Sequence, residues 1–159
     1  MNAVLGVLRH PRVVLVAQIW IGLVFLAAAL GKISDPAAFA KQIHYFRLVP
    51  MGFENTVAIT LPWIELVAAL SLLMRAQPRS GAIVTAGLMV MFVVAVTAAL
   101  ARGLDIECGC FGTSDAGRTG VAKLLENIGL LALATIASLK PASRSVTAAP
   151  AGIAVHETA

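Results

Sequence analysis

The chain has 159 residues, of which 59% are hydrophobic and only 13% are charged, and its mean hydropathy is +0.90. A soluble domain carries about 25% charged residues, so this composition excludes an ordinary soluble domain and indicates an integral membrane protein. The twelve Lys and Arg residues outnumber the eight Asp and Glu residues, giving a formal net charge of +4. Because they are scattered among loops and helix ends and form no basic stripe, they argue against nucleic-acid binding.

Four windows almost free of charge predict four transmembrane helices. They cover residues 13–30, 57–74, 82–101 and 121–139, each 18 to 20 residues long. At about 1.5 Å per residue, each spans roughly 27 to 30 Å, the thickness of the hydrocarbon core of a bilayer. The predicted fold class is therefore an all-α membrane protein, a four-helix bundle within residues 1–140. Residues 141–159 are rich in Pro, Ser, Ala and Thr and predict a disordered C-terminal tail.

The first window has an alternative interpretation as a signal peptide. Arg9 and Arg12 precede the apolar run, and the run ends in small residues at 27–29. Its 18 residues exceed the usual 7 to 15 of a signal-peptide core, so we treat the segment as the first membrane helix.

A short amphipathic segment follows the first window. Gly31 and Pro36 are expected to interrupt the helix, with Ser34 or Asp35 capping the next one. Within residues 37–46, three apolar side chains recur at helical spacing, opposite two polar ones: Phe39, Ile43 and Phe46 against Lys41 and Gln42. This pattern predicts a short interfacial helix with its rings toward lipid or protein. An ordinary polar connecting loop is the alternative.

Glu65 falls in the middle of the second window. An ionised carboxylate there costs about 2.5 to 3.5 kcal/mol on insertion scales, so an ionisable residue at this depth suggests a function. Glu65 is a candidate proton carrier for a quinone in the bundle. Alternatively, it is a neutral carboxyl hydrogen-bonded to Gln18 or Asn127 of neighbouring helices.

Two tryptophans inside the predicted windows and two cationic residues outside them indicate function less strongly than Glu65 does. Trp63 and Trp20 would either stack on a quinone ring or pack in the bundle. Lys32 and Arg47 are expected to anchor the protein at the membrane interface.

The last two windows flank the most polar internal stretch of the chain. The window at 82–101 is rich in small residues suited to close helix contacts. In the first two turns of the last window, Lys123 and Glu126 stand three residues apart, a spacing that predicts an ion pair.

The only two cysteines, Cys108 and Cys110, lie in that polar stretch with one glycine between them. A disulfide between them would close a three-residue loop, for which the chain-entropy estimate is about 1.6 kcal/mol, small enough for strain to cancel. A bridge that adds so little stability fits thiol-disulfide exchange better than a structural role. An inert pair remains open, as does metal binding, but the three dispersed histidines offer no set of four ligands.

The positive charges bear on the orientation in the membrane. Six Lys and Arg residues fall on the side of the two termini and six on the other side, but they are denser on the terminal side, where residues 75–81 carry two arginines in seven positions. This density predicts both termini in the cytoplasm and the cysteines outside the membrane, where disulfides persist.

Four stretches of the chain resemble the MauE branch of the DoxX-like membrane proteins. They are Gly31-Lys32 with Asp35-Pro36-Ala37-Ala38-Phe39, Tyr45-Phe46-Arg47-Leu48-Val49-Pro50, Leu61-Pro62 with Glu65-Leu66, and Arg102-Gly103 through Ile106 to Cys108-Gly109-Cys110-Phe111-Gly112. The resemblance implies a role in maturing a disulfide-rich periplasmic partner, such as the small subunit of methylamine dehydrogenase, and a link to thiol redox chemistry and quinones. One departure is that Glu126 precedes Asn127 where the pattern commonly has an arginine.

Two functions follow as alternatives. The first is a membrane thiol-disulfide oxidoreductase that uses Cys108 and Cys110 on an exported disulfide-containing protein and passes electrons to a membrane quinone or a thioredoxin-like protein. The second is a non-catalytic membrane assembly factor for an exported redox enzyme. A small transporter is a third and weaker interpretation, because only one carboxylate lies centrally in the predicted helices.

Overall fold

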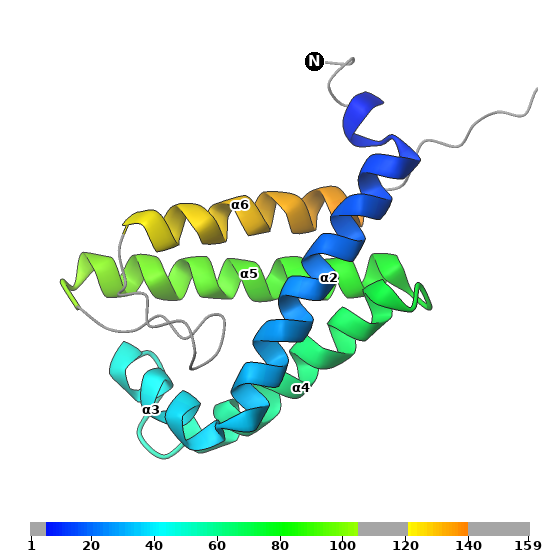
Figure 1. Ribbon diagram of the computed structural model, residues 1–159. Coiled ribbons are helices and arrows are strands. Elements are labelled where there is room, and N and C mark those ends of the chain that lie inside the picture. Colours follow the sequence, from blue (N-terminus) through cyan, green and yellow to red (C-terminus); the bar gives the residue numbers. More distant parts are fainter. Residues whose placement is uncertain (1–5, 105–120, 140–159) are drawn as a thin grey trace, which may run out of the picture.

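The computed structural model describes residues 6–104 and 121–139, and these form an all-helical membrane bundle. Its helices are α2 (Pro11–Ser34), α3 (Pro36–Phe46), α4 (Glu54–Leu73), α5 (Pro78–Ala101) and α6 (Val121–Ser138) (Figure 1). Within the described part, four of them, α2, α4, α5 and α6, are long and apolar enough to cross a membrane. The predicted fold class is confirmed, and so is a short helix between the first two spans. The predicted C-terminal tail lies outside the described residues.

Prolines and one aspartate set where the helices begin. Pro11, Pro36 and Pro78 each occupy the first turn of a helix, where their missing N–H would have no partner in any case. Asp35 caps α3, because its carboxylate accepts a hydrogen bond from the backbone N–H of Ala38 at 2.9 Å. Gly31 does not interrupt the helix as expected, because α2 continues to Ser34, four residues beyond the end of the predicted window, and the chain turns at Asp35.

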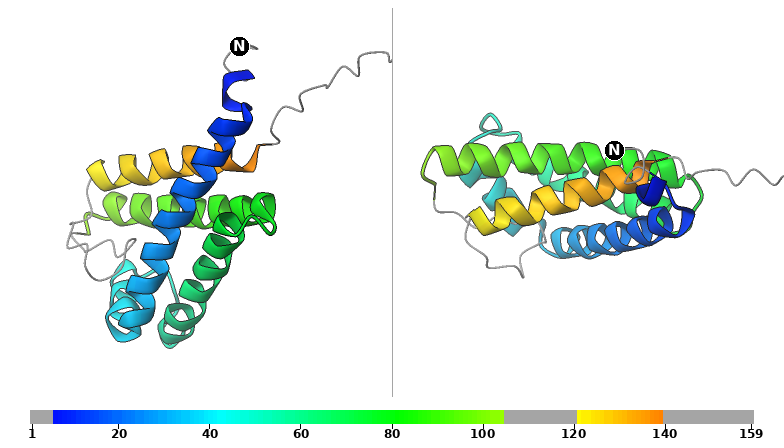
Figure 2. Two further views of the ribbon diagram at one scale, coloured as in Figure 1. Left: turned by 45° about the vertical axis from the view of Figure 1, so that its right-hand side comes forward. Right: turned by 90° about the horizontal axis from the view of Figure 1, so that it is seen from above.

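The bundle consists of two helix pairs that cross (Figures 1 and 2). In one pair α2 packs along α4, and in the other α5 packs along α6. Gly81 allows α5 to approach α4 closely, because a Cβ at this position would lie 2.9 Å from Cβ of Ser71 and 3.0 Å from the carbonyl oxygen of Ala68. Close contacts through small residues are the usual way in which helices associate in lipid.

Polar side chains also join the two pairs. Gln18 of α2 donates a buried hydrogen bond of 2.9 Å to the carbonyl oxygen of Ala137, near the end of α6. The last carbonyls of a helix have no partner within the helix, so this contact satisfies a group that would otherwise be buried without one.

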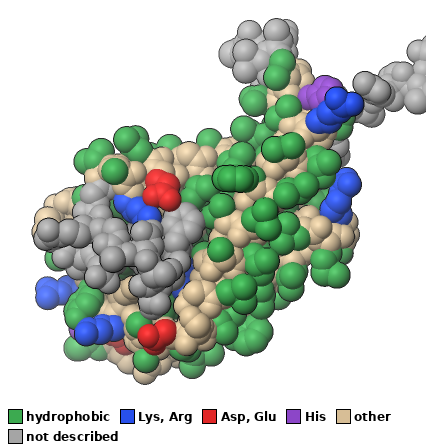
Figure 3. All heavy atoms as spheres, in the orientation of Figure 1, with side chains coloured by type: hydrophobic (Ala, Val, Ile, Leu, Met, Phe, Trp, Pro, Cys, Tyr) green, Lys and Arg blue, Asp and Glu red, His purple; other side chains and the backbone are tan. Residues whose placement is uncertain are grey.

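The outer surface of the helices is apolar, as a lipid environment requires. Figure 3 shows hydrophobic side chains spread along the exposed faces of the helices. Val16, Val67 and Val94 are among the residues that are at least 60% exposed. We therefore describe the chain as a multi-pass membrane protein.

Candidate functional site

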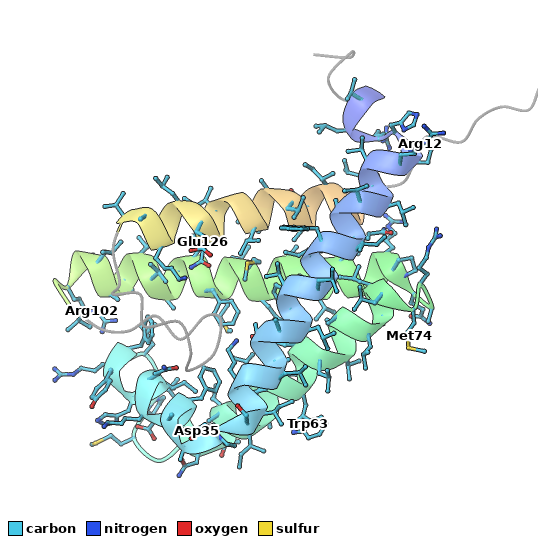
Figure 4. All side chains as sticks on the ribbon, in the orientation of Figure 1. Arg12, Asp35, Trp63, Met74, Arg102 and Glu126 are labelled. Atoms are coloured by element: carbon cyan, nitrogen blue, oxygen red, sulfur yellow. The ribbon has the colours of Figure 1, made fainter. Side chains whose placement is uncertain are left out.

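The ends of α3, α5 and α6 define the end of the bundle that flanks the two cysteines. Cys108 and Cys110 lie outside the described residues, which stop at Leu104 after α5 and resume at Val121 of α6. Arg102, labelled in Figure 4, connects the end of α5 to the end of α3. Its Nη2 donates to the carbonyl oxygen of Phe46 at 2.6 Å, and its Nη1 donates to the carbonyl oxygen of Arg47 at 3.4 Å.

A buried ion pair joins the first two membrane helices. Nζ of Lys32 in α2 lies 2.6 Å from Oε1 and 2.8 Å from Oε2 of Glu65 in α4, and neither side chain is exposed. The expectation that Lys32 anchors the protein at the interface is therefore wrong, because its ammonium is inside the bundle. Gln18 is not a partner of Glu65, since its side chain binds the end of α6 instead.

Two aromatic rings complete the surroundings of Lys32. Its Nζ lies 5.2 Å from the centroid of Phe39 in α3 and 4.8 Å from that of Phe92 in α5. Both distances are within the range of cation–π attraction, which grows as the cation loses its water. The ammonium thus contacts three other helices of the bundle, through one carboxylate and two rings.

The helical phase explains why the lysine is buried. Ile21, Phe25, Ala28 and Lys32 of α2 are spaced by four, three and four residues, and all are buried. Such spacing keeps side chains on one face of a helix. Glu65 lies likewise between buried Leu61 and Ala69 of α4. The spacing of apolar residues along these helix faces could have revealed the pair. It did not, because the charge-free window ended at residue 30 and left Lys32 outside the predicted helix.

The pair can hold a proton in either of two positions. A carboxylate 2.6 Å from an ammonium is joined to it by a short, charge-assisted hydrogen bond. With both side chains shielded from water, the charges must be compensated by each other and by the neighbouring rings. The arrangement suits either an ion pair that holds α2 against α4 or a site that takes up and releases a proton.

A cavity of about 160 Å³ lies beside the pair, between α3, α4 and α5. Phe39 and Phe92 line this cavity as well as contacting Lys32. Gln42 also lines it, and the glutamine is 8% exposed. Gln42 therefore does not lie on the polar face of α3 with Lys41, as the amphipathic pattern predicted. The pattern assigned the inner face to Phe39, Ile43 and Phe46. In the structure, Gln42 also lies on this face, because it is three residues after Phe39 and four residues before Phe46.

The two tryptophans lie on the outer surface. Trp20 is 60% exposed and Trp63 is 56% exposed, so neither packs inside the bundle. Figure 4 shows Trp63 pointing away from the other helices, and Trp63 does not line the cavity. The residues that line the cavity are therefore better placed to enclose an aromatic ring than the exposed Trp63.

The charged residues at the start of α6 pair as predicted. Nζ of Lys123 lies 3.1 Å from Oε2 of Glu126, which confirms the expected pairing three residues apart. Glu126 is half exposed, with 47% of its side chain accessible, whereas Asn127 is fully buried. Within residues 6–104 and 121–139, no cluster of three or more His, Cys, Asp or Glu side chains could hold a metal ion.

Comparison with known proteins identifies the family. A family model described as "Methylamine utilisation protein MauE" matches residues 10–140. The chain belongs to the MauE family. The match includes α2 to α6, both members of the buried pair and the segment with the two cysteines.

Curated members of the MauE family resemble the chain over most of its length. The methylamine utilization protein MauE of Paracoccus denitrificans is 31% identical over 156 residues, which cover 96% of this chain and 84% of the relative. That of Paracoccus versutus is 32% identical over 140 residues, covering 87% and 75%. That of Methylophilus methylotrophus is 28% identical over 138 residues, covering 86% and 73%. No solved structure matches the chain.

Proposed function

We propose that this MauE-family protein is a membrane accessory protein of methylamine utilisation that supports disulfide formation in an exported partner. The methylamine role is taken from the names of its relatives. The thiol role is supported by one observation. Leu104 and Val121, which flank the only two cysteines in the sequence, lie at the end of the bundle where Arg102 binds the end of α3 (Figure 1). Our proposal is that the dithiol acts at this end of the bundle on a partner outside the membrane.

The proposed chemistry is thiol-disulfide exchange. A thiolate of the partner attacks the disulfide between Cys108 and Cys110, the partner's second thiol resolves the mixed disulfide, and the partner leaves oxidised. Cys108 and Cys110 are then both reduced to thiols. Their reoxidation releases two electrons and two protons, which pass to a quinone, giving the hydroquinone, or to an oxidised thioredoxin-like protein.

Glu65 is proposed to carry protons in this reoxidation, with Lys32 as its partner. The support is geometric, because the carboxylate and the ammonium share short hydrogen bonds and are shielded from water. A proton accepted by Glu65 would leave Lys32 charged and stabilised by Phe39 and Phe92. Contact of a quinone with Trp63 remains a prediction, and it would have to occur at the lipid-facing surface.

Both termini are proposed to lie in the cytoplasm. The burial of Lys32 supports this orientation, because a lysine paired inside the bundle no longer counts as a loop charge. Lys123 is also buried and is paired with Glu126 of the same helix, so without these two lysines the six-to-six division of positive charges becomes six to four in favour of the terminal side. The cysteines would then be outside the membrane.

Substitution of each cysteine tests the thiol role in the native host. We expect Cys108→Ser and Cys110→Ser to abolish growth on methylamine and to leave the small subunit of methylamine dehydrogenase with free thiols, as measured by alkylation and mass spectrometry. Ser114→Ala, in the same segment, is the control and should behave as the wild type. Labelling of both thiols in intact cells by a membrane-impermeant maleimide should succeed after reduction.

The assembly factor gives a different result. If the protein only holds its partner, deletion of the chain abolishes maturation while both serine variants support it fully. A partner that acquires its full set of disulfides with Cys108→Ser and Cys110→Ser would therefore refute the thiol role and leave the non-catalytic role standing.

A further inference from the structure

Among the described residues, a single polar side chain lines the cavity between α3, α4 and α5. Twelve described residues line it, and of these only Gln42 is polar. Oε1 of Gln42 is buried and has no hydrogen-bond partner among the described residues. A buried oxygen without a donor costs about 1 to 3 kcal/mol, and a ligand that supplies a donor recovers part of this, about 1 kcal/mol net, because its donor gives up a hydrogen bond to water.

Water is a poor occupant of this cavity. A buried water needs two to four polar partners, and the walls are almost entirely apolar apart from Gln42. A lipid acyl chain would fill the space but would leave Oε1 of Gln42 without a donor. The occupant that matches both features is apolar over most of its surface and carries one hydrogen-bond donor.

The size and the walls of the cavity indicate a single ring. An enclosed apolar cavity of about 150 Å³ in another protein binds benzene, and this cavity, which is partly open to the outside, has a comparable volume of about 160 Å³. Phe39, Phe46 and Phe92 contribute aromatic rings to its walls. Aromatic rings attract one another in stacked or edge-to-face arrangements.

We infer that this cavity binds one hydroxylated aromatic ring, with the ring among Phe39, Phe46 and Phe92 and the hydroxyl donating to Oε1 of Gln42. This chemistry is shared by free phenols and by the head groups of membrane hydroquinones. The inference concerns binding alone and stands independently of the cysteines, so it can fail or succeed whatever the outcome of the cysteine substitutions.

Fluorine NMR on the full chain in lipid nanodiscs tests the site with 4-fluorophenol and fluorobenzene as probes. We expect the phenol to bind about fivefold more tightly than fluorobenzene, the value of one net hydrogen bond. In Gln42→Leu this preference should disappear while fluorobenzene still binds, and the retained binding shows that the variant is folded. Equal affinities of the two probes in the wild type would overturn the inference, because they would show that the hydroxyl makes no hydrogen bond to Oε1 of Gln42.

A cavity-filling variant shows where the probes bind. Ala95 lines the cavity, whereas the adjacent Val94 is 60% exposed on the outer face of the same helix. Ala95→Phe should abolish binding of both probes, and Val94→Phe should leave it unchanged. Loss of binding in both variants, or in neither, would contradict the assignment to this cavity.

A tailed probe then distinguishes the two sources of the ring. A hydroquinone with a ten-carbon tail, added to the nanodiscs under reducing conditions, should displace 4-fluorophenol if the cavity serves a membrane hydroquinone. Binding of 4-fluorophenol without displacement by the tailed compound assigns the site to soluble phenols. Absence of binding by every hydroxylated probe would refute the site altogether.

Discussion

The buried pair makes removal of one charge far more damaging than removal of both. Lys32 and Glu65 are completely shielded from solvent, so Lys32→Met leaves a carboxylate inside the bundle without its cation. Breaking a buried pair in this way typically costs about 3 to 5 kcal/mol, and replacing both members with apolar residues of similar volume is often neutral. We therefore expect Lys32→Met to destabilise the protein by about 3 kcal/mol, and the double variant with Glu65→Leu to recover most of that loss.

The two single substitutions should lower the free energy of unfolding by different amounts, because the surroundings of the pair favour the ammonium over the carboxylate. In Glu65→Leu the lone ammonium still faces the rings of Phe39 and Phe92, at 5.2 Å and 4.8 Å. Cation–π attraction at a desolvated site is worth about 2 kcal/mol, whereas among the described residues the carboxylate of Glu65 has a hydrogen bond only from Lys32. Lys32→Met should therefore cost about 1 to 2 kcal/mol more than Glu65→Leu.

Equilibrium unfolding in mixed detergent micelles, followed by circular dichroism, measures the free energy of unfolding of the wild type, the two single variants and the double variant. These four values form a double-mutant cycle. Lys41→Met, which removes an exposed lysine of α3 whose Nζ lies 5.9 Å from the ring centroid of Tyr45, is the control and should change the free energy of unfolding by less than about 1 kcal/mol. If the double variant loses the sum of the two single losses, the side chains do not interact and the reasoning is refuted. If it is stable but fails to support maturation, the pair has the proton-carrying role rather than a purely structural one.

Two further predictions concern how the helices are held together. Gly81→Val should weaken the contact of α5 with α4 by about 1 to 3 kcal/mol in the same unfolding assay, whereas Gly87→Val, where an added Cβ meets nothing within 4 Å, should not. Arg102→Ala should free the end of α3 by removing the hydrogen bond to the carbonyl oxygen of Phe46, which amide hydrogen exchange of α3 would report as faster exchange. Arg79→Ala, at the other end of α5, should leave the exchange of α3 unchanged, and equal protection in both variants would contradict the role of Arg102.

The sequence predicted the membrane spans because hydropathy alone determines whether a segment of about 20 residues can lie in lipid. It also predicted that Ser34 or Asp35 caps α3, of which the structure shows Asp35, and it predicted the pair of Lys123 with Glu126, because both contacts depend on residues three apart in the chain. Local chemistry was sufficient in each case.

The interactions between helices were not predicted, because they depend on which faces meet. Glu65 was recognised as unusual, but its partner lies 33 residues away on a helix whose predicted end fell short of it. Gln42 was placed on the polar side of α3, although the structure turns it inward toward α4 and α5. A search for charged and amide residues that continue an apolar face beyond a charge-free window would have detected Lys32.

The pair and the cavity share two rings, and this links them energetically. Phe92→Leu removes the ring 4.8 Å from the ammonium of Lys32 and also enlarges the cavity. Phe25→Leu is the matched control, because Phe25 is 2% exposed in the core and is not among the rings near Lys32. Both variants lose packing, but only Phe92→Leu loses cation–π attraction, so it should be more destabilising by about 1 kcal/mol.

That difference should vanish when the cation is absent. In the background of Lys32→Met with Glu65→Leu, Phe92→Leu and Phe25→Leu should lower the free energy of unfolding by amounts that agree within about 0.5 kcal/mol. If the difference persists, packing around Phe92 and not its contact with the ammonium accounts for the loss. If it vanishes, the ring that borders the cavity is also the ring that stabilises the charge, and a ligand that shifts Phe92 will alter the balance of charge between Lys32 and Glu65.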